Sequence, residues 1–397
     1  MRILHAAIGF YPSQIWGGFP PVVASMSKGL IERGHQVTVL TSSILDYGRL
    51  MQRDSFEGEW DGIPVVYLKA HWRGRRSDSV GFIWMPDLWK YRRLIRDADL
   101  VHIHGYRTFM FVGAGLLAQY YHVPYLIQPH GSLPPLLGRA RLKRIFDVSI
   151  GQHILRHAAG GIALSESEHA DFVKYGVRVE RLFKITNPFD PAVCPDLPDG
   201  QAFRQRFGIP ADQRIVLFLS RIHKKKGLDL LIEAVAMLDR DDVLLCVVGP
   251  DDGFESTARD MVRRRGLEGR TLFTGPLYDR AKFEAYRAAD LYVLSSRGVE
   301  GLPMTILEAL YCHTPVIVTR TVDIAEMVDG RAGMAVDYDA GQLRDAIAQT
   351  LDKPDLRKAF AQEAPVLLRE HFELDPVLDR LLEIYQTCTA PQGAARG

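Results

Sequence analysis

The sequence contains no apolar run long enough to cross a membrane, and its opening segment lacks the apolar core and cleavage site of a signal peptide. Its cysteines are scattered, without the spacing of metal ligands, at Cys194, Cys246, Cys312 and Cys388. Buried thiols are therefore expected, rather than disulfides or a zinc site. Together these absences predict a soluble protein that stays in the cytoplasm.

Acidic pairs of the kind that hold divalent cations are poorly placed. The pattern Asp-x-Asp occurs at Asp97/Asp99, Asp239/Asp241 and Asp337/Asp339. The first two pairs precede strand-like segments and the third resembles a helix start, whereas ligands collect at the carboxyl ends of strands. His102 and His104 alternate along one strand-like segment, and on that ground we do not expect them to converge on an ion. No metal is predicted.

Charge is unevenly distributed along the chain. Residues 1–190 hold 23 Lys and Arg against 16 Asp and Glu, while the remainder holds 26 against 32, although the net charge is only +1. A basic first half is typical of proteins that meet an anionic partner, such as a phospholipid surface or a pyrophosphate-linked acceptor. Ordinary solvated surface charge explains the asymmetry about equally well.

Strand-like apolar runs alternate with helix-like segments from end to end. The expected strands are 3–8, 36–41, 65–68, 100–104, 125–128, 161–164 and 183–186, followed by 215–219, 243–248, 271–274, 291–294, 316–319 and 334–336. Near-continuous apolar strands between helices indicate parallel sheets covered on both faces. A polar, Pro-rich stretch follows residue 190. We therefore predict an α/β protein of two Rossmann-like, doubly wound domains that face each other across a cleft. They cover residues 1–190 and 191–371, and a C-terminal helix at 372–389 completes the first.

The first turn after a strand carries Gly17–Gly18, followed by two prolines and a helix. Glycines let a ligand approach the backbone closely, and a helix start offers unpaired N–H groups to a phosphate. The spacing fits neither a Walker loop nor the dinucleotide fingerprint. By itself the pattern is weak, because paired glycines in a loop usually form only a turn.

A second candidate follows the first strand of the second domain, where four cations occur within six residues of one another. Arg221 comes directly after the strand and Lys226 stands at the expected helix start. Such a pair can neutralise a diphosphate without a metal ion.

The third candidate is Glu300–Ala309. Glu300 lies in a loop after the strand 291–294, and Glu308 lies about one and a half turns into a helix that begins near Pro303. Two carboxylates placed in this way can hold hydroxyl groups of one ligand from two sides, while backbone N–H groups of the loop face its phosphates.

Taken together and in this order, these pieces resemble the GT-B retaining glycosyltransferases, a large family that includes sucrose synthases and many bacterial polysaccharide and lipopolysaccharide sugar transferases. The resemblance spans nearly the whole chain. Its most specific element is the pair Glu300 and Glu308 with seven residues between them. One departure stands out: Pro303 occupies a position where many relatives have glycine, and proline cannot donate an N–H.

The resemblance assigns a role to each matching position. Arg221 and Lys226 would bind the diphosphate, Glu300 the hydroxyl groups of the donor sugar, and Glu308 the ribose. His130, just after the strand 125–128, would lie beside the transferred sugar. The remaining positions expected to bind the donor are Gly17, Gly18, Gly275, Leu277, Tyr278, Gly301, Leu302, Met304 and Thr305, together with Pro303. No cofactor is expected besides the nucleotide sugar, linked to UDP or GDP.

The sequence indicates the acceptor site less clearly than the donor site. His104, Tyr106 and Arg107 follow a strand and are candidates to line its site. Cations mixed with aromatic and aliphatic residues at 71–76, 84–93 and 139–146 suit an anionic membrane interface, although a solvated basic helix is nearly as good an explanation. Peripheral attachment at the inner face of the membrane follows as a hypothesis. Nucleic acid is a poor candidate, because no known nucleic-acid module accompanies the charge.

The expected activity is the retaining, metal-independent transfer of a hexose-type sugar to a glycan or lipid-linked glycan, in the synthesis of cell-surface polysaccharide or lipopolysaccharide. The alternatives are a sugar-nucleotide 2-epimerase of the same fold and a catalytically silent nucleotide-sugar-binding protein. An epimerase would convert the nucleotide sugar without any acceptor.

Overall fold

The computed structural model of the chain describes residues 1–390 apart from residues 14, 47–48, 52, 73–82, 134–139, 239 and 299. The basic residues at 73–76, Arg139 and Asp239, all considered above, lie outside the described residues. By their contacts the described residues form two compact units. Unit 1 consists of Met1–Pro188 and the segment from Leu374 onward, and unit 2 of Phe189–Glu373.

Unit 1 is built on an eight-stranded sheet of order β10-β9-β8-β7-β1-β2-β6-β5, in which only β5 runs antiparallel to its neighbour. The strands are β1 (Arg2–Ala7), β2 (Gln36–Ser42), β5 (Phe56–Trp60), β6 (Ile63–Leu68), β7 (Leu100–His104), β8 (Tyr125–Gln128), β9 (Gly160–Ala163) and β10 (Leu182–Lys184). A separate hairpin pairs β3 (Ile44–Asp46) with β4 (Arg49–Leu50).

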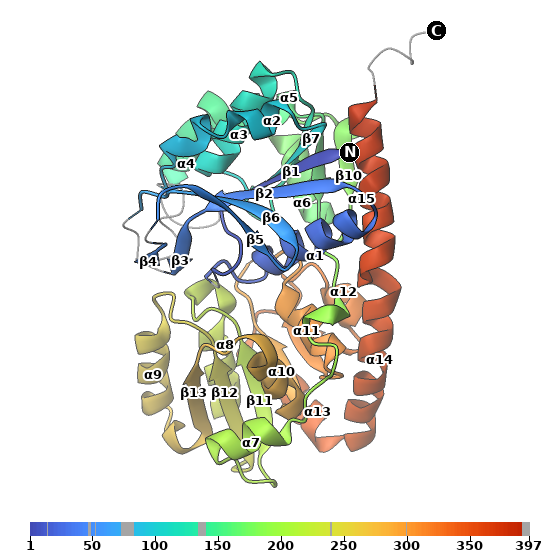
Figure 1. Cartoon of the computed structure of the whole chain (residues 1–397). Coiled ribbons are helices and arrows are strands. Elements are labelled where there is room, and N and C mark those ends of the chain that lie inside the picture. Colours follow the sequence, from blue (N-terminus) through green and yellow to red (C-terminus); the bar gives the residue numbers. More distant parts are fainter. Residues whose placement is uncertain are drawn as a thin grey trace. The chain divides into compact units, whose positions relative to one another are not determined.

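Helices cover both faces of this sheet. Figure 1 shows α1 and α15 on one side and α2, α3 and α5 on the other. The helices are α1 (Phe19–Glu32), α2 (Arg92–Arg96), α3 (Phe109–Tyr120), α4 (Ala140–Phe146), α5 (Gln152–His157), α6 (Glu166–Lys174) and α15 (Leu374–Thr389). Although α15 is the last element in the chain, it packs beside α1 in the first unit.

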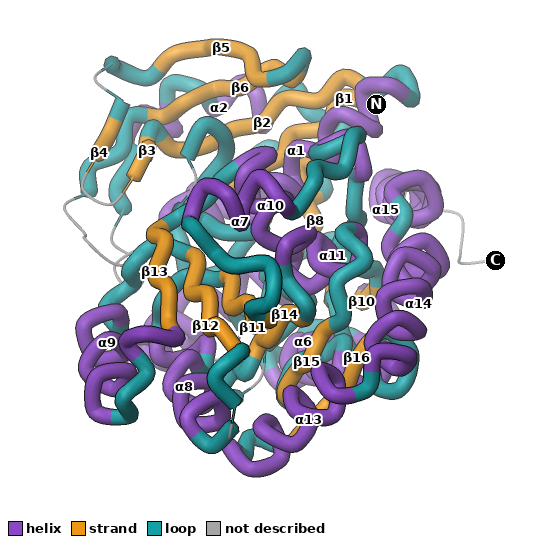
Figure 2. The backbone as a smooth tube through the Cα atoms, turned by 90° about the horizontal axis from the view of Figure 1, so that it is seen from below, coloured by secondary structure: helices purple, strands orange, loops and turns teal. Residues whose placement is uncertain are grey.

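Unit 2 contains a six-stranded, wholly parallel sheet of order β13-β12-β11-β14-β15-β16. Its strands are β11 (Arg214–Leu219), β12 (Val243–Val248), β13 (Thr271–Gly275), β14 (Leu291–Leu294), β15 (Val316–Thr319) and β16 (Gly333–Val336). Figure 2 shows the strands side by side, with α8, α9 and α13 beyond one face and α7, α10 and α11 beyond the other. The two units confirm the predicted pair of doubly wound α/β domains.

The helices of unit 2 include one short 3-10 turn, η6, that matters for the site. They are α7 (Gln201–Phe207), η6 (Lys224–Lys226), α8 (Leu228–Ala236), α9 (Glu255–Arg264), α10 (Asp279–Ala288), α11 (Met304–Tyr311), α12 (Ala325–Val328), α13 (Ala340–Asp352) and α14 (Pro354–Phe372). β11 and β14 are neighbours across which the strand order reverses, so the loops that follow them adjoin at the carboxyl edge of the sheet.

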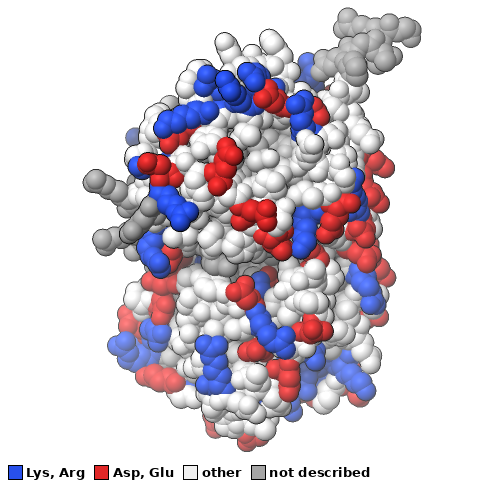
Figure 3. Space-filling model, in the orientation of Figure 1, with Lys and Arg blue, Asp and Glu red and all other residues white. Residues whose placement is uncertain are grey.

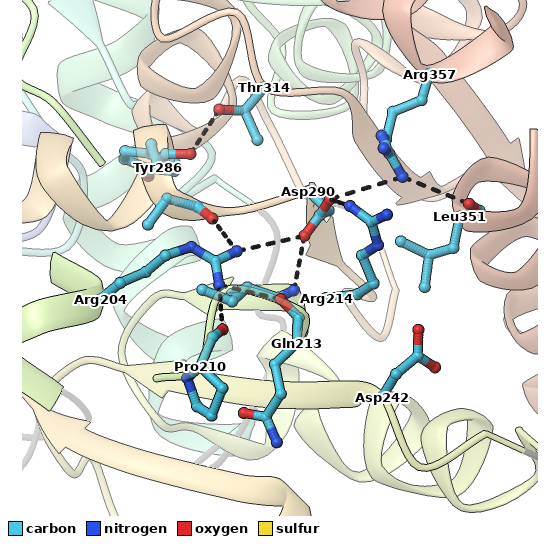
Figure 4. A network of polar contacts seen from close by, with 12 residues as sticks. Arg204, Pro210, Gln213, Arg214, Asp242, Tyr286, Asp290, Thr314, Leu351 and Arg357 are labelled. Atoms are coloured by element: carbon cyan, nitrogen blue, oxygen red, sulfur yellow. Dashed lines mark hydrogen bonds and ion pairs between the residues drawn. The ribbon is translucent and has the colours of Figure 1, made fainter. Parts of the chain in front are cut away.

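At the opposite edge of this sheet, Asp290 forms ion pairs with three arginines (Figure 4). One of its oxygens lies 3.2 Å from Arg214 and 3.6 Å from Arg357. The other lies 3.7 Å from Arg204 and accepts the backbone N–H of Ile215 at 2.9 Å. The Asp290 side chain is only 10% exposed, so its negative charge compensates cations that water reaches poorly.

Asp290→Asn should therefore destabilise the protein by about 2 kcal/mol and lower Tm by roughly 4–8 °C. This cost is smaller than that of breaking a fully buried ion pair, because the Arg214 side chain is partly exposed. Asp212→Asn is the matched control, because Asp212 is exposed. It should change the free energy of unfolding by no more than about 0.5 kcal/mol. Urea unfolding of both variants measures the difference, and equal midpoints would contradict a structural role for the Asp290 network.

Candidate active site

The candidate site in unit 2 forms where β11 and β14 end. The loop after β11 carries Arg221 and the η6 turn, and the loop after β14 carries Glu300. Lys226 Nζ lies 2.6 Å from Glu300 Oε1, and Lys225 Nζ lies 3.4 Å from Glu300 Oε2. The side chains of Lys226 and Glu300 are 12% and 14% exposed. The structure thus joins two residues that are 74 positions apart in the sequence.

The pair is ionised in spite of its burial. Burial by itself raises the pKa of Glu300, but Lys226, Lys225 and Arg221 outweigh that effect and lower it to about 2. Burial lowers the pKa of Lys226, and Glu300 opposes that shift. A cation and an anion held in a poorly hydrated loop interact more strongly than on the surface. The cluster therefore offers both a positive charge for phosphate and a carboxylate for hydroxyl groups.

Arg221 also has a carboxylate partner, which sequence reasoning missed. Its Nη1 donates to Asp252 Oδ2 at 2.5 Å, and the Asp252 side chain is wholly buried while that of Arg221 is 32% exposed. Asp252 follows β12, the strand next to β11, so it too lies at the carboxyl edge of the sheet. That position is the signal that could have identified it. Asp252 holds the guanidinium beside the Lys226 and Glu300 pair.

Gly227 fixes the turn that positions Lys226. Its φ of +71° is in the left-handed region, and a Cβ there would collide with the backbone carbonyl oxygen of Ser295. The Ser295 side chain also holds this turn, because its hydroxyl donates to the carbonyl oxygen of Gly227 at 2.7 Å. Only glycine meets both requirements. Lys226 accordingly lies in η6, just before α8, rather than inside the helix itself.

Glu308 lies on α11 and is held separately. Lys282 Nζ donates to its Oε1 at 2.7 Å and the Tyr286 hydroxyl donates to its Oε2 at 3.2 Å. Its side chain is 7% exposed. Burial, together with Glu308, raises the pKa of Tyr286 well above its ordinary value, so the hydroxyl stays a donor. The predicted carboxylates are therefore positioned by different cations, Glu300 by Lys226 and Glu308 by Lys282.

The other unit 2 positions predicted for the donor lie at the start of α11 with the loop before it, and in the loop after β13. Pro303 caps α11, which begins at Met304, and the Thr305 hydroxyl accepts a hydrogen bond from Tyr292 at 2.8 Å. Glu300 anchors the preceding loop, because its N–H donates to Thr321 O at 2.9 Å; Gly301 and Leu302 follow it. The other loop comes after β13. There Gly275 adopts a φ of +73° and Leu277 and Tyr278 follow, with Tyr278 38% exposed.

In unit 1, His130 lies beside Phe19, the residue that follows the Gly17–Gly18 turn. Gly17 has a φ of +66° and Gly18 caps α1. The next residue, Phe19, places its ring 5.1 Å from that of His130 in an edge-to-face arrangement. His130 Nε2 lies 3.1 Å from His104 Nδ1. Burial lowers the pKa of His130 to about 3, so its ring is neutral at physiological pH. Two separately predicted features are thus neighbours.

Tyr106 and Arg107, predicted for the acceptor site, are engaged in a buried network. Arg107 lies 2.8 Å from Asp147 through Nη2 and donates to the carbonyl oxygens of Ser132 and Leu133, both at 2.7 Å. The Tyr106 hydroxyl donates to Asp147 at 3.0 Å. These bonds fasten the segment after β8 to α3 and to the π-helical turn η3 (Asp147–Gly151). Contact with an acceptor stays a prediction for both residues, and for His104.

The reasoning that separated His102 from His104 was wrong. Residues two apart on a strand project from the same face, because the side-chain period is two. Their ring centroids lie 4.0 Å apart, and His5 of the neighbouring strand joins them. A nitrogen of each of the three rings lies within 4.8 Å of the others, an arrangement that could hold a metal ion.

The described residues of the Asp-x-Asp pairs form ion pairs with arginines or cap a helix. Asp97 binds Arg96 and Asp99 binds Arg2, both ahead of β7. Asp339 caps α13 by accepting the N–H of Gln342 at 2.8 Å, which confirms the predicted helix start. Among the described residues, no helix combines the length and the apolar character that crossing a membrane requires.

Known proteins resemble the chain along nearly all of its length. The family described as "Glycosyl transferases group 1" matches residues 199–366, and the "Glycosyl transferase 4-like domain" matches residues 17–188. Mannosylfructose-phosphate synthase of Agrobacterium fabrum is 33% identical over 372 residues, which cover 86% of this chain and 77% of that enzyme. D-inositol 3-phosphate glycosyltransferase of Xylanimonas cellulosilytica is 27% identical over 73% of this chain and 72% of its own. Other enzymes of that name match over about half of their length, 51% and 50% in two cases.

Solved structures agree on the fold. The Anabaena protein HepE, crystallised with UDP and glucose, superposes with a TM-score of 0.76 at 21% identity, over 96% of this chain and 98% of its own. Two doubly wound domains together with these matches define the class as a glycosyltransferase of the GT-B fold. The chain belongs to the glycosyl transferases group 1 family, and it is a retaining enzyme that takes its sugar from a nucleotide sugar.

Proposed function

We propose that this enzyme transfers a hexose-type sugar from a UDP-sugar to a glycan or lipid-linked glycan acceptor, in the synthesis of cell-surface polysaccharide or lipopolysaccharide. The observation that carries the proposal is the buried group of Arg221, Lys226 and Glu300 at the carboxyl edge of the unit 2 sheet. The choice of UDP is supported by HepE, which binds UDP and UDP-glucose. The choice of pathway is supported by WaaG, a lipopolysaccharide glycosyltransferase with a TM-score of 0.68.

Each residue has a task in this proposal. Arg221 and Lys226 neutralise the diphosphate, so that Lys226 exchanges the Glu300 carboxylate for phosphate oxygens when the donor binds. Glu300 is then released to accept hydrogen bonds from sugar hydroxyls. Glu308 holds the ribose, and His130 contacts the transferred sugar as a neutral imidazole.

The chemical step breaks the bond between the anomeric carbon and the phosphate oxygen and forms a bond from the same carbon to the acceptor oxygen. The acceptor proton passes to the departing phosphate oxygen on the same face of the sugar, which retains the anomeric configuration. Arg221 and Lys226 stabilise the negative charge that develops on the diphosphate. Fixed cations in a poorly hydrated loop are suited to this, since they need little reorganisation during the reaction.

A thermal-shift panel with UDP, GDP and ADP tests the donor. UDP is expected to raise Tm most, because the tightest-binding nucleotide stabilises the folded state most. The stabilisation grows with the logarithm of the ratio of ligand concentration to Kd. The UDP-sugar that gives the largest shift is then incubated with and without glycan acceptors. Release of UDP that depends on an acceptor supports the proposal. Conversion of the UDP-sugar to its 2-epimer without an acceptor, or binding without turnover, would contradict it.

We propose that the enzyme attaches to an anionic membrane surface through unit 1, which would bring it to a lipid-linked acceptor. Large apolar side chains are exposed on α4 at Leu142 (55%) and Ile145 (60%), in η3 at Val148 (67%), and ahead of α2 at Trp84 (56%) and Trp89 (59%). Cations accompany them, and Arg92 stacks over the Trp89 ring at 4.8 Å. Figure 3 shows Lys and Arg gathered at the top of the view, over the helices that Figure 1 places there. Apolar side chains ringed by cations suit an interface with acidic lipids.

In a flotation assay the protein should therefore bind vesicles that contain phosphatidylglycerol at low salt, and binding should weaken at high salt as the charges are screened. Val148→Glu should reduce the bound fraction several-fold, because it places an anion in the apolar surface. Val193→Glu is the matched control, as Val193 is 45% exposed but belongs to unit 2. Equal binding by the two variants, or none by the unaltered protein, would refute the attachment.

A further inference from the structure

Three buried histidines stand together in unit 1, on β1 and β7. His5 is on β1 and lies directly opposite His102 on β7 in the parallel register, and His104 follows two residues later on the same face. All three side chains are completely buried. Two histidines spaced by one residue on a strand, with a third on the adjoining strand, place three imidazoles side by side on one face of the sheet.

Each ring has a partner at Nδ1 that orients it. The Ser27 hydroxyl donates to Val23 O at 2.7 Å, so at its 3.2 Å contact with His5 Nδ1 it can only accept, and His5 carries its proton on Nδ1. His102 Nδ1 lies 2.7 Å from the Tyr385 hydroxyl on α15, and His104 Nδ1 lies 3.1 Å from His130 Nε2. Histidines that ligate metals are held in this manner, with one nitrogen engaged and the other directed at the ion.

The opposite nitrogens lack comparable partners. Within the described part of the chain, Nε2 of His102 and Nε2 of His104 have no hydrogen bond although both are buried. His5 Nε2 has a long contact, 3.3 Å, with the Tyr385 hydroxyl. Gln128 is opposite His104 on β8, and its buried carboxamide lies beside the His102 ring. Unsatisfied polar atoms are rare in protein interiors, and two buried imidazole nitrogens beside a buried carboxamide suit a bound ion.

We propose that Nε2 of His5, His102 and His104, with Oε1 of Gln128 as a fourth ligand, form a structural site for Zn²⁺. Neutral imidazole is the ligand that zinc and its neighbours prefer, whereas Mg²⁺ and Ca²⁺ require oxygen ligands. Burial keeps all three rings in the neutral form by lowering their pKa values, that of His5 to about 3. A tetrahedral ion with bonds of about 2.0–2.1 Å needs ligand atoms about 3.3 Å apart. One nitrogen of each ring lies within 4.8 Å of the other two, so these atoms must approach one another by up to about 1.5 Å to meet that requirement.

The site would stabilise unit 1 by tying β1, β7 and β8 together and, through Tyr385, by fixing α15. The proposed role of the ion is structural, and no step of the transfer reaction is assigned to it, although His104 contacts His130 at 3.1 Å. Its failure and that of the proposed function are therefore distinguishable, because donor binding and turnover are measured separately from metal content.

The test is the zinc content of the full chain produced in zinc-supplemented medium and dialysed against EDTA. About one zinc per chain should survive dialysis, because an ion with fully buried ligands leaves only when the unit opens. The matched control is the double variant His153→Ala/His157→Ala. These two histidines are exposed one helical turn apart on α5, with ring centroids 4.2 Å apart, and could chelate zinc on the surface. That variant should retain the zinc, while His102→Leu should lose it.

Refolding the unaltered protein with Co²⁺ gives a second readout that needs no variant. Visible d–d bands of a tetrahedral nitrogen and oxygen site, without thiolate charge-transfer bands, are expected. The proposal is overturned if the dialysed protein contains no zinc, if the zinc is lost with His153 and His157, if His102→Leu retains it, or if the refolded protein binds no Co²⁺. The histidines would in those cases form a hydrogen-bonded network around buried water.

Discussion

Replacement of Lys226 by alanine is expected to lower kcat for sugar transfer by about 10²–10³-fold, the usual cost of removing one group that stabilises charge developing in the transition state. Lys226 is 12% exposed and its charge is held 2.6 Å from Glu300. The diphosphate gains negative charge as its bond to the sugar breaks, so the loss should appear in kcat and in kcat/KM together. Initial rates of UDP release with saturating acceptor measure both quantities.

Lys224→Ala provides the matched control. It removes the same charge from the same turn, but the Lys224 side chain is exposed. Its rate should stay within a few-fold of the unaltered enzyme, since exposed charges act through water and are screened. Because Lys226→Ala also leaves Glu300 without its nearest cation, Tm and circular dichroism are recorded for each variant. Full turnover by a folded Lys226→Ala enzyme would remove Lys226 from the mechanism.

Acidification of the metal-free protein from pH 7 to pH 5 should destabilise it by at least about 4 kcal/mol, through its buried histidines. An unfolded histidine titrates near 6.5, whereas burial lowers the folded pKa of His5 and of His130 to about 3. The unfolded chain therefore binds protons first, and stability that is complete above pH 6.5 is lost as the pH falls towards 3. Each group contributes about 2 kcal/mol over this interval. His102 and His104 are shifted in the same direction and add to the effect.

Carboxylates do not account for such a loss, because the pKa of Glu300 is lowered to about 2 and its ordinary value is 4.5, so it stays ionised in both states down to about pH 5. Urea unfolding at pH 7, 6 and 5 gives the slope. His5→Asn, which keeps a polar group near Ser27 but no longer titrates, should reduce the pH dependence by about 2 kcal/mol. A free energy of unfolding that changes by less than about 1 kcal/mol between pH 7 and 5 would show that these histidines are accessible to protons in the folded state.

The strands that are buried on both faces of a sheet could be predicted from the sequence. Such strands appear as short runs of Val, Ile and Leu, and several predicted bounds, including Val243–Val248 and Leu291–Leu294, agree with the structure. β5 was missed for the opposite reason. Its residues Phe56–Trp60 form an antiparallel edge strand in which no side chain is fully buried, so pairing with β6 rather than hydrophobic patterning defines it.

The candidate site was predictable in part, because parallel strands bring their carboxyl ends to one edge. That rule led to Arg221, Lys226 and Glu300, which the structure joins. It did not reveal Asp252, the partner of Arg221, because that requires knowing that β12 adjoins β11. Nor did it reveal Lys282, the partner of Glu308, because that requires knowing that α10 packs on α11. The histidines were misjudged because the strand period was applied incorrectly, and the third member, His5, depends on which strand neighbours β7.

The position of α15 has a consequence for how the protein is made. Its Tyr385 reaches the His5 ring across 380 residues of sequence, and its Leu378 occupies the space that a side chain at Gly29 would need. Unit 2 lies wholly within Phe189–Glu373, so its chain is synthesised in full before α15 is. Unit 1, whose first strand emerges earliest, can close its core only after the last helix follows. The half of the protein that is translated first should therefore finish folding last.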